Sequence, residues 1–161
     1  MTSVLPPIPR IVFTIFEPIS LVAGFFVTIL DTENFVRSQL PSISATPVWP
    51  AATTRVLALQ LGNLYGLLAM IGVGVLYTTT EPKVVRNFVL ACAVADVGHI
   101  WATCAVMGQD DFLDVMNWNV MAWGNIGVTT GLLVVRIFYL IGALGQNRVV
   151  ATTKQAVKKN M

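Results

Sequence analysis

Four long apolar stretches alternate with short polar connections along the chain. We predict helices at Ile11–Leu30, Val56–Tyr77, Val84–Met107 and Trp118–Leu144, because each stretch reaches the roughly 20 residues that cross about 30 Å of hydrocarbon. None of them shows the alternation with a period of two that a membrane strand needs. Backbone polar groups in lipid must be bonded within the protein, so the pattern predicts transmembrane helices.

The composition agrees with this interpretation. Of the 161 residues, 55% are hydrophobic and 11% are charged, against roughly 25% charged residues in ordinary soluble domains. The four stretches occupy most of the chain and leave no room for a soluble domain. We therefore predict an all-α integral membrane protein, a four-helix bundle that forms a single transmembrane domain over residues 1–161 and ends in a basic tail at residues 145–161.

The distribution of Lys and Arg over the connections predicts the orientation. Most of them fall on one side of the membrane, namely Arg10, Lys83, Arg86, Arg148, Lys154, Lys158 and Lys159. The other side has Arg37 and Arg55 beside Asp31, Glu33, Asp110, Asp111 and Asp114. Because the more basic connections stay in the cytosol, both termini are expected to be cytosolic.

The end of the chain suggests a compartment. Lys158-Lys159-Asn160-Met161 resembles the dilysine retrieval signal of endoplasmic reticulum membrane proteins, which must be cytosolic and C-terminal. The alternative is a basic tail that only holds to anionic lipid headgroups. We expect a multi-pass protein of the endoplasmic reticulum membrane.

Each predicted helix carries polar residues at spacings of three and four, which place them on one face. These are Thr14 and Glu17; Gln60 and Asn63; Cys92, Asp96, His99 and Thr103; and Trp118, Asn125, Thr129 and Arg136. Polar and ionisable groups are costly in lipid, so we expect the four faces to turn inward and meet in the bundle.

Depth along each helix sharpens this expectation. At 1.5 Å per residue, Asp96 lies roughly 18 Å from the cytosolic end of its helix, while Asn63 and Asn125 lie about 12 Å from the luminal ends of theirs. These three residues would share one layer of a ~30 Å core. The predicted result is a polar column with Glu17 on one wall and an Asp96–His99 pair on the other.

Structural interpretations of the same residues remain open. Asp96 and His99 can form an ion pair that only fixes helix register. Glu17, which precedes Pro18, can bond to the backbone or to Arg136. The amides of Gln60, Asn63 and Asn125 can join helices, Trp123 can belong to an interfacial aromatic belt, and Arg136 can extend to the cytosolic surface.

Connections and small residues predict the packing. Gly62 with Gly66, and Gly127 with Gly131, are spaced for close helix contacts, and such faces also allow a homo-oligomer. The short Thr78–Arg86 connection predicts a tight antiparallel hairpin. Asp31–Leu40 is expected to form a short interfacial helix with Phe35, Val36 and Leu40 turned to the bilayer. The luminal connections, this one and Gln109–Asn117, would together cover a cavity.

The candidate chemistry is proton transfer. No Ser or Cys stands out as a nucleophile, one His with scattered acids is a poor metal set, and no cofactor motif is present, so we expect no cofactor, no metal and no nucleic acid. Two carboxyl groups in unlike surroundings can serve as acid and base. We expect Asp96, oriented by His99, as base and Glu17 as acid, or the reverse. The residues expected to bind a lipophilic substrate are Gln60, Asn63, Tyr65, Trp123, Asn125 and Arg136.

Several segments carry a resemblance to known proteins. They are Phe16-Glu17-Pro18-Ile19-Ser20, Leu59-Gln60-Leu61-Gly62-Asn63-Leu64-Tyr65, Asp96-Val97-Gly98-His99 and Trp118-Asn119 through Trp123-Gly124-Asn125. They resemble an uncharacterised fungal family of small four-span membrane proteins, and the chain is similar in size and topology to the membrane epoxide hydrolase/cyclases of fungal polyene-pyrone polyether biosynthesis. A distant likeness in architecture links it to emopamil-binding-type sterol isomerases and fungal membrane terpene cyclases.

The resemblance implies an epoxide-opening hydrolase or cyclase of secondary metabolism, and it carries Glu17, Asn63, Asp96, His99 and Asn125 over as site residues. Two alternatives stay open. One is an isomerase or terpene cyclase that starts by protonating an alkene, and the other is a non-catalytic lipid-binding or assembly protein in which the polar residues only join helices.

Overall fold

The computed structural model describes residues 4–41 and 51–147, and these contain four helices long and apolar enough to cross a membrane. The first span consists of α1 (Pro7–Ile11), the π-helical turn η1 (Val12–Phe16) and α2 (Glu17–Leu30). The second and third are α4 (Ala52–Thr78) and α5 (Pro82–Met107). The fourth consists of α7 (Val120–Ala122), the π-helical turn η3 (Trp123–Val128) and α8 (Thr129–Leu140). The predicted all-helical, four-span fold is confirmed.

The last span ends earlier than the sequence predicted, at Leu140 instead of Leu144. Gly142 has a positive φ of 80°, a conformation that costs glycine little. Its N–H donates to the Tyr139 carbonyl at 3.0 Å, and the Ala143 N–H donates to the Phe138 carbonyl at 2.9 Å. This pair of bonds is the Schellman arrangement that closes a helix.

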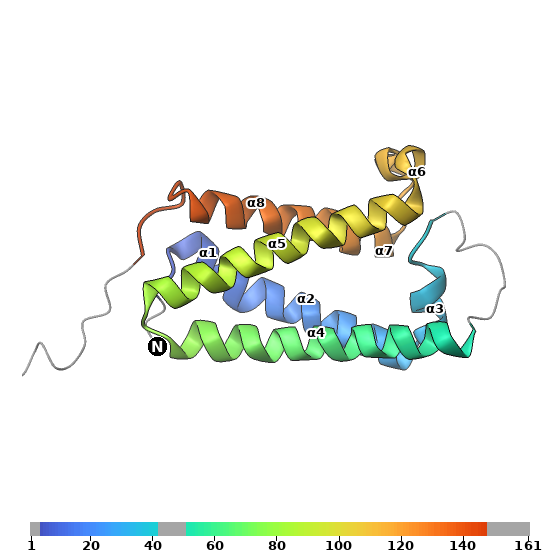
Figure 1. The fold of residues 1–161 in the computed structure, drawn as a ribbon, viewed down its shortest axis with the longest axis horizontal. Helices are drawn as coiled ribbons and strands as arrows, with labels where there is room; N and C mark the ends of the chain where they lie inside the picture. The colour runs from blue at the N-terminus through green and yellow to red at the C-terminus, as the bar shows by residue number, and fades with distance from the viewer. Residues whose placement is uncertain (1–3, 42–50, 148–161) are drawn as a thin grey trace, which may run out of the picture.

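Two connections fold into short helices at the same end of the bundle (Figure 1). The first is α3 (Thr32–Arg37), which begins where the Asp31 carboxylate accepts a hydrogen bond from the Asn34 N–H at 3.2 Å. The others are α6 (Gln109–Leu113) and the 3₁₀ turn η2 (Val115–Asn117). The expected short helix is confirmed, but Phe35 is buried and Leu40 packs in a cluster around Met107. These two side chains therefore pack into the protein and not into the bilayer.

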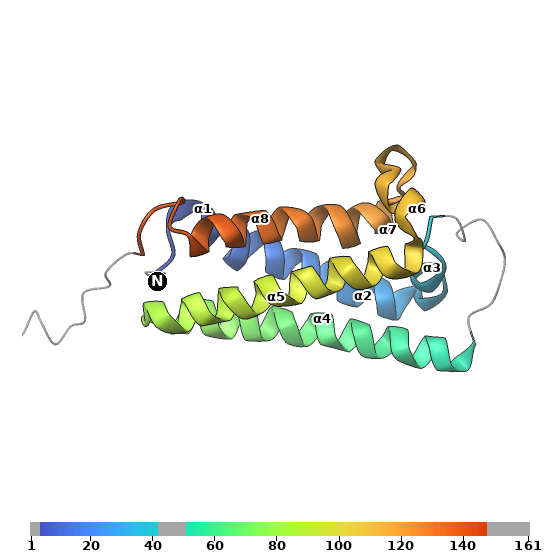
Figure 2. The same ribbon diagram turned by 45° about the horizontal axis from the view of Figure 1, so that its top comes forward.

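The helices pack as two pairs, α2 against α4 and α5 against α8. Figures 1 and 2 show α4 and α5 side by side at their shared turn and diverging toward α3 and α6. We call these two ends of the bundle the turn end and the loop end. The predicted tight hairpin between the second and third spans is thus present only near the turn end, where Leu76 shares a buried cluster with Val85 and Val89.

The first span crosses from one pair to the other. Its beginning, α1, lies beside α8, whereas α2 packs on α4 (Figure 1). The first and last described parts of the chain meet at the turn end. Val4, Leu5 and Tyr139 share a buried cluster there, and Leu144 packs against this cluster. Glu17 is the first residue of α2 and so lies where the span passes between the two pairs.

Glycines bring α2 and α4 close together. A Cβ atom built on Gly62 would lie 2.9 Å from the Cβ of Thr28, and one on Gly66 would lie 3.0 Å from Cδ2 of Phe25. The predicted close contact through these glycines is confirmed. The second predicted pair differs, because Gly131 has open space around it and Gly127 faces Trp123 of its own span.

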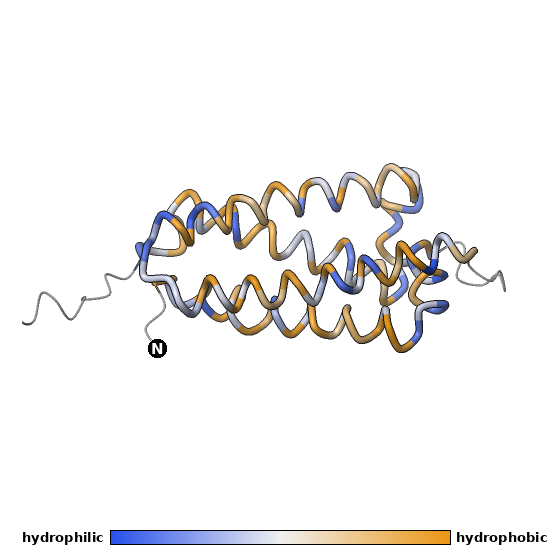
Figure 3. Tube along the Cα trace, turned by 60° about the horizontal axis from the view of Figure 1, so that its bottom comes forward, coloured by the Kyte–Doolittle hydropathy of each residue, from blue (hydrophilic) through white to orange (hydrophobic). Residues whose placement is uncertain are grey.

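The outer surface is suited to lipid. Figure 3 shows hydrophobic residues along the long helices and hydrophilic ones gathered mainly at the two ends. Large apolar side chains such as Ile19, Val94 and Val134 are exposed. In a bilayer these side chains would contact lipid tails, which is the expected surface of a multi-pass membrane protein.

Candidate functional site

Arg136 joins three of the four spans. Its side chain is 2% exposed, its Nη2 pairs with Oε1 of Glu17, and its Nη1 pairs with Oδ2 of Asp96. Glu17 comes from the first span, Asp96 from α5 and Arg136 from α8. We call these three residues the acid–arginine cluster. A guanidinium holds five N–H donors in a fixed planar fork, so two of its nitrogens can bind two carboxylates at once.

The direction of the Arg136 side chain follows from the direction of its helix. Side chains in a helix lean toward the N-terminus of that helix, and the N-terminus of α8 faces the loop end (Figure 1). The arginine therefore extends from the turn end into the bundle, where its guanidinium carbon lies 5.5 Å from the centre of the Phe13 ring. The alternative that it extends to the surface near its helix end is wrong.

Pro18 determines how the backbone carries Glu17. Proline has no N–H, so it cannot donate to the Thr14 carbonyl four residues earlier, as a regular helix would require. The chain widens into the π-helical turn η1 just before Glu17, and the Tyr77 hydroxyl of α4 donates to the Thr14 carbonyl at 2.9 Å. π-Helical turns are frequent at functional sites.

Asp96 lies on the face of α5 that packs against α8, and its partner is Arg136. Cys92, one turn earlier on the same helix, lies beside the same guanidinium. His99, one turn later, bonds to the main chain of Asn125 in η3. The predicted Asp96–His99 pair is therefore wrong, because the arginine of another span offers the carboxylate a full charge at hydrogen-bonding distance.

Both carboxyl groups retain an oxygen outside the ion pairs. The side chains of Glu17 and Asp96 are 16% and 13% exposed, and each bonds to Arg136 through one oxygen. Among the described residues, no buried side-chain nitrogen or oxygen lacks a hydrogen-bond partner. The second oxygens, Oε2 of Glu17 and Oδ1 of Asp96, have no hydrogen bond and are therefore not fully enclosed by the protein.

A separate polar contact ties the loop end together. Nδ2 of Asn125 donates to Oε1 of Gln39 at 2.7 Å, and Nδ2 of Asn119 donates to the Ser38 carbonyl at 3.0 Å. These bonds connect the segment after α3 to the fourth span. The predicted depth places Asn125 level with Asp96, but its main chain bonds to His99, one turn nearer the loop end, and its amide binds Gln39. Gln39 lies outside the apolar stretches, so their pattern gave no reason to select it.

The remaining candidate residues lie away from the cluster. Gln60 and Asn63 are exposed on α4, on the side opposite the buried Ala58 and Gly62. Tyr65 packs with its ring against Gly24. The predicted column to which all four helices contribute is therefore wrong for α4, whose polar face turns outward. Trp123 is 50% exposed and packs edge-on against Trp118, with ring centres 5.2 Å apart.

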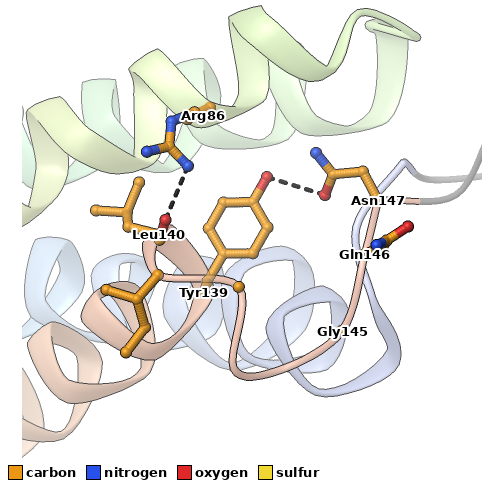
Figure 4. A pocket seen from close by; sticks show the side chains of 8 residues that line it. Arg86, Tyr139, Leu140, Gly145, Gln146 and Asn147 are labelled. Atoms are coloured by element: carbon orange, nitrogen blue, oxygen red, sulfur yellow. Dashed lines mark hydrogen bonds between the residues drawn. The ribbon is translucent and has the colours of Figure 1, made fainter.

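A pocket of about 310 Å³ lies at the turn end and not at the cluster (Figure 4). In it Arg86 donates to the Leu140 carbonyl at 2.8 Å, and the Tyr139 hydroxyl donates to Oδ1 of Asn147 at 3.1 Å. Residues 4–41 and 51–147 contain no group of three or more His, Cys, Asp or Glu side chains that could hold a metal ion. In the described part of the chain, we therefore take the acid–arginine cluster as the candidate functional site.

The fold and the cluster define a multi-pass helical membrane protein with two acids held by one arginine between its spans. A family model described as a domain of unknown function, DUF7704, matches residues 2–146. The chain belongs to this family. Neither the search of curated proteins nor that of solved structures returned a match.

Proposed function

We propose that the acid–arginine cluster is the proton-transfer site of a membrane enzyme that opens epoxides of a lipophilic, polyketide-like substrate by hydrolysis or cyclisation. The observation that supports this proposal is the sharing of Arg136 by Glu17 and Asp96, each with one oxygen left accessible. A purely structural ion pair needs one acid, and the second acid adds a charge that the arginine does not balance.

Charge balance indicates how such a site works. Two carboxylates and one guanidinium carry one net negative charge, and adding one proton to either acid makes the cluster neutral, which hydrocarbon surroundings favour. The protonated carboxyl gives its proton to the epoxide oxygen as the C–O bond breaks. The other carboxylate takes a proton from the attacking water or hydroxyl as the new C–O bond forms.

Arg136 suits this exchange because it contacts both acids. Turnover moves one proton from one carboxyl group to the other, so the total charge beside the guanidinium is the same before and after. The arginine is a positioning residue that holds both acids at fixed places relative to the substrate. His99, one turn from Asp96, is assigned to the wall of the substrate site and not to the orientation of the base.

The substrate class rests on the resemblance to fungal epoxide hydrolase/cyclases and on the apolar surface around the cluster. A substrate that is itself soluble in lipid can reach a site between spans from the bilayer. The same acids also suit a proton-initiated isomerase or terpene cyclase, in which the proton goes to an alkene carbon instead of an epoxide oxygen. The isotope that enters the product distinguishes the two reactions.

The test uses full-length protein in lipid vesicles with a long-chain terpenoid or polyene epoxide in H₂¹⁸O. We expect diol or cyclic ether from the native protein, ¹⁸O in the diol, and a loss of about 100-fold or more in rate for Glu17→Gln and for Asp96→Asn. The matched control, Asp110→Asn, changes an exposed acid of α6 and should retain the native rate.

Two results would overturn the proposal. Unchanged turnover in both amide variants would remove the acids from the mechanism. Solvent deuterium appearing on product carbon, with no epoxide opened, would assign the isomerase reaction instead. Thermal unfolding of each variant must accompany the assay, so that a loss of rate is separated from a loss of fold.

The compartment is part of the same proposal. We assign the protein to the endoplasmic reticulum membrane, with the Lys158-Lys159 pair as its retrieval signal; these residues lie outside the described ones. Replacing both lysines with alanine should move a tagged protein to later secretory membranes, and an unchanged distribution would contradict the assignment.

A further inference from the structure

The outer face of α4 carries polar side chains that are exposed and have no hydrogen-bond partner in the described chain. Gln60 and Asn63 are exposed, and within residues 4–41 and 51–147 neither amide forms a hydrogen bond. The opposite face of the helix, with Ala58, Gly62 and Ala69, is buried against α2. Carboxamides that face lipid tails lose their bonds to water without gaining a partner, which is costly.

Both amides lie at membrane depth and not at its surface. The midpoint of Ala52–Thr78 is Tyr65, so Asn63 lies ~3 Å and Gln60 ~7.5 Å from it at 1.5 Å per residue. A hydrocarbon core of about 30 Å extends ~15 Å to each side of its centre. Neither side chain is therefore placed where water or headgroups solvate it.

The residues around these amides follow a heptad spacing. Steps of four and three along one side of α4 connect Val56, Gln60, Asn63, Leu67, Met70 and Gly74, and all of them are exposed. This is the seam by which two helices pack with a small left-handed crossing angle. A Cβ built on Gly74 meets nothing within 4 Å, so the turn-end part of the seam also has room for a close neighbour.

We propose that this α4 face, the Val56–Gly74 seam, pairs with the same face of a second copy of the chain across a two-fold axis perpendicular to the membrane. Copies in one membrane share their orientation, so the two α4 helices run parallel and each residue meets itself at the same depth. A carboxamide both donates and accepts hydrogen bonds. The Asn63 side chains of the two copies therefore bond to each other, and the two Gln60 side chains bond in the same way one turn away.

This seam is a different surface from the glycine faces on which the sequence predicts an oligomer. Gly62 and Gly66, the glycines that suggested one, are used inside the chain against Thr28 and Phe25. The unpaired seam lies on the other side of the same helix and away from Glu17 and Asp96. The pairing is consequently independent of the proposed enzymatic function, and either can fail alone.

The experiment compares two neighbouring cysteines in the full-length protein in phosphatidylcholine vesicles. Leu67 and Leu68 are 44% and 38% exposed but differ by about 100° around the helix, so only Leu67 is on the seam. With a mild oxidant, Leu67→Cys should give a disulfide-linked homodimer on a non-reducing gel, whereas Leu68→Cys should give no more than the native chain, which carries Cys92 and Cys104.

A second measurement tests the amides themselves. Energy transfer between labelled copies in vesicles reports the dimer dissociation constant, and Gln60→Leu with Asn63→Leu should raise it about 10-fold, since each amide layer contributes roughly threefold or more. Leucine fits a lipid-facing position, so the monomer should keep its fold and thermal stability.

Each outcome of these two experiments either supports or overturns the proposed pairing. Dimers that form through residue 67 and weaken with the leucine variant support the proposal. Equal cross-linking at residues 67 and 68, no energy transfer between copies at high protein-to-lipid ratio, or an affinity unchanged in the leucine variant would each overturn it. A cross-link through residue 67 to a different protein, in place of a second copy, would also overturn it.

Discussion

The hydroxyl of Tyr77 in α4 donates a hydrogen bond to the main-chain carbonyl of Thr14 in the first span, at 2.9 Å. This contact supplies the hydrogen bond that Pro18, lacking an N–H, cannot give to that carbonyl. Glu17 lies three residues after Thr14 and directly before Pro18. The tyrosine of one helix thus compensates for the proline that shapes the backbone of another, next to the acid–arginine cluster.

A double-mutant cycle on Tyr77 and Pro18 tests this compensation. Tyr77→Phe should lower the free energy of unfolding by about 1 kcal/mol, since the Thr14 carbonyl loses its donor. In the Pro18→Ala background the restored N–H can serve that carbonyl, so the same change should cost roughly half as much or less. Unfolding in mixed micelles measures both values, and equal costs would mean that the two donors are unrelated.

Removing Arg136 should be far more damaging than removing a surface arginine. Arg136→Met leaves two partly buried acids without their cation and should cost about 3 kcal/mol in unfolding free energy, the lower end of the range for fully buried pairs. Adding Glu17→Gln and Asp96→Asn makes the cluster neutral and should recover most of that loss. Arg86→Gln, at an exposed position where one hydrogen bond to a carbonyl is lost, should cost about 1 kcal/mol. A neutral triple variant as unstable as Arg136→Met would contradict the charge argument.

Alanine at two glycines should have opposite effects. Gly62→Ala places a methyl group 2.9 Å from Thr28 Cβ and Cγ2, so α2 and α4 must separate, at a cost of about 1–3 kcal/mol. Gly131→Ala meets open space and should be neutral or stabilising by up to ~1 kcal/mol through helix propensity. Thermal unfolding of the two variants in the same detergent gives the comparison, and a Gly131→Ala variant as unstable as Gly62→Ala would mean that the fourth span also packs through its glycines.

The contact between Asn125 and Gln39 should control the opening of the loop end. Asn125→Ala and Gln39→Ala each remove the 2.7 Å bond and should speed hydrogen exchange in α3 (Thr32–Arg37) by about 3–10-fold, equivalent to ~1 kcal/mol. The double variant should exchange no faster than the stronger single one. Additive effects would show that the two side chains act through separate contacts.

Sequence periodicity was sufficient for the spans but not for the faces. Length and apolarity located all four membrane helices because the bilayer imposes both, independently of what packs where. Which face of a helix turns inward depends on neighbours, and periodicity alone does not distinguish a polar face that meets the bundle from one that meets a second chain. Gln60 and Asn63 have the same pattern as Asp96 and His99, yet they face the opposite way.

The partner of Asp96 illustrates what spacing along one helix cannot show. His99 is the ionisable residue nearest to Asp96 on α5, and spacing along the helix alone therefore favours an Asp96–His99 pair. Arg136 is distant from Asp96 in sequence. Its helix runs toward the turn end, and side chains lean toward the start of their helix, so Arg136 can be expected to point back into the bundle. In the sequence, Pro18 signals the π-helical turn η1 beside Glu17. No residue signals the second π-helical turn, η3, which contains Asn125.

The order of the three cluster residues along the chain has a consequence for membrane insertion. Glu17 and Asp96 are in the first and third spans, and the cation that pairs with both is in the last. Until that helix has left the ribosome and entered the bilayer, both acids lack the guanidinium that pairs with them in the folded protein. Completion of the cluster therefore coincides with completion of the membrane domain, and a chain that stops short of Arg136 exposes two unpaired acids to the systems that survey membrane proteins for quality.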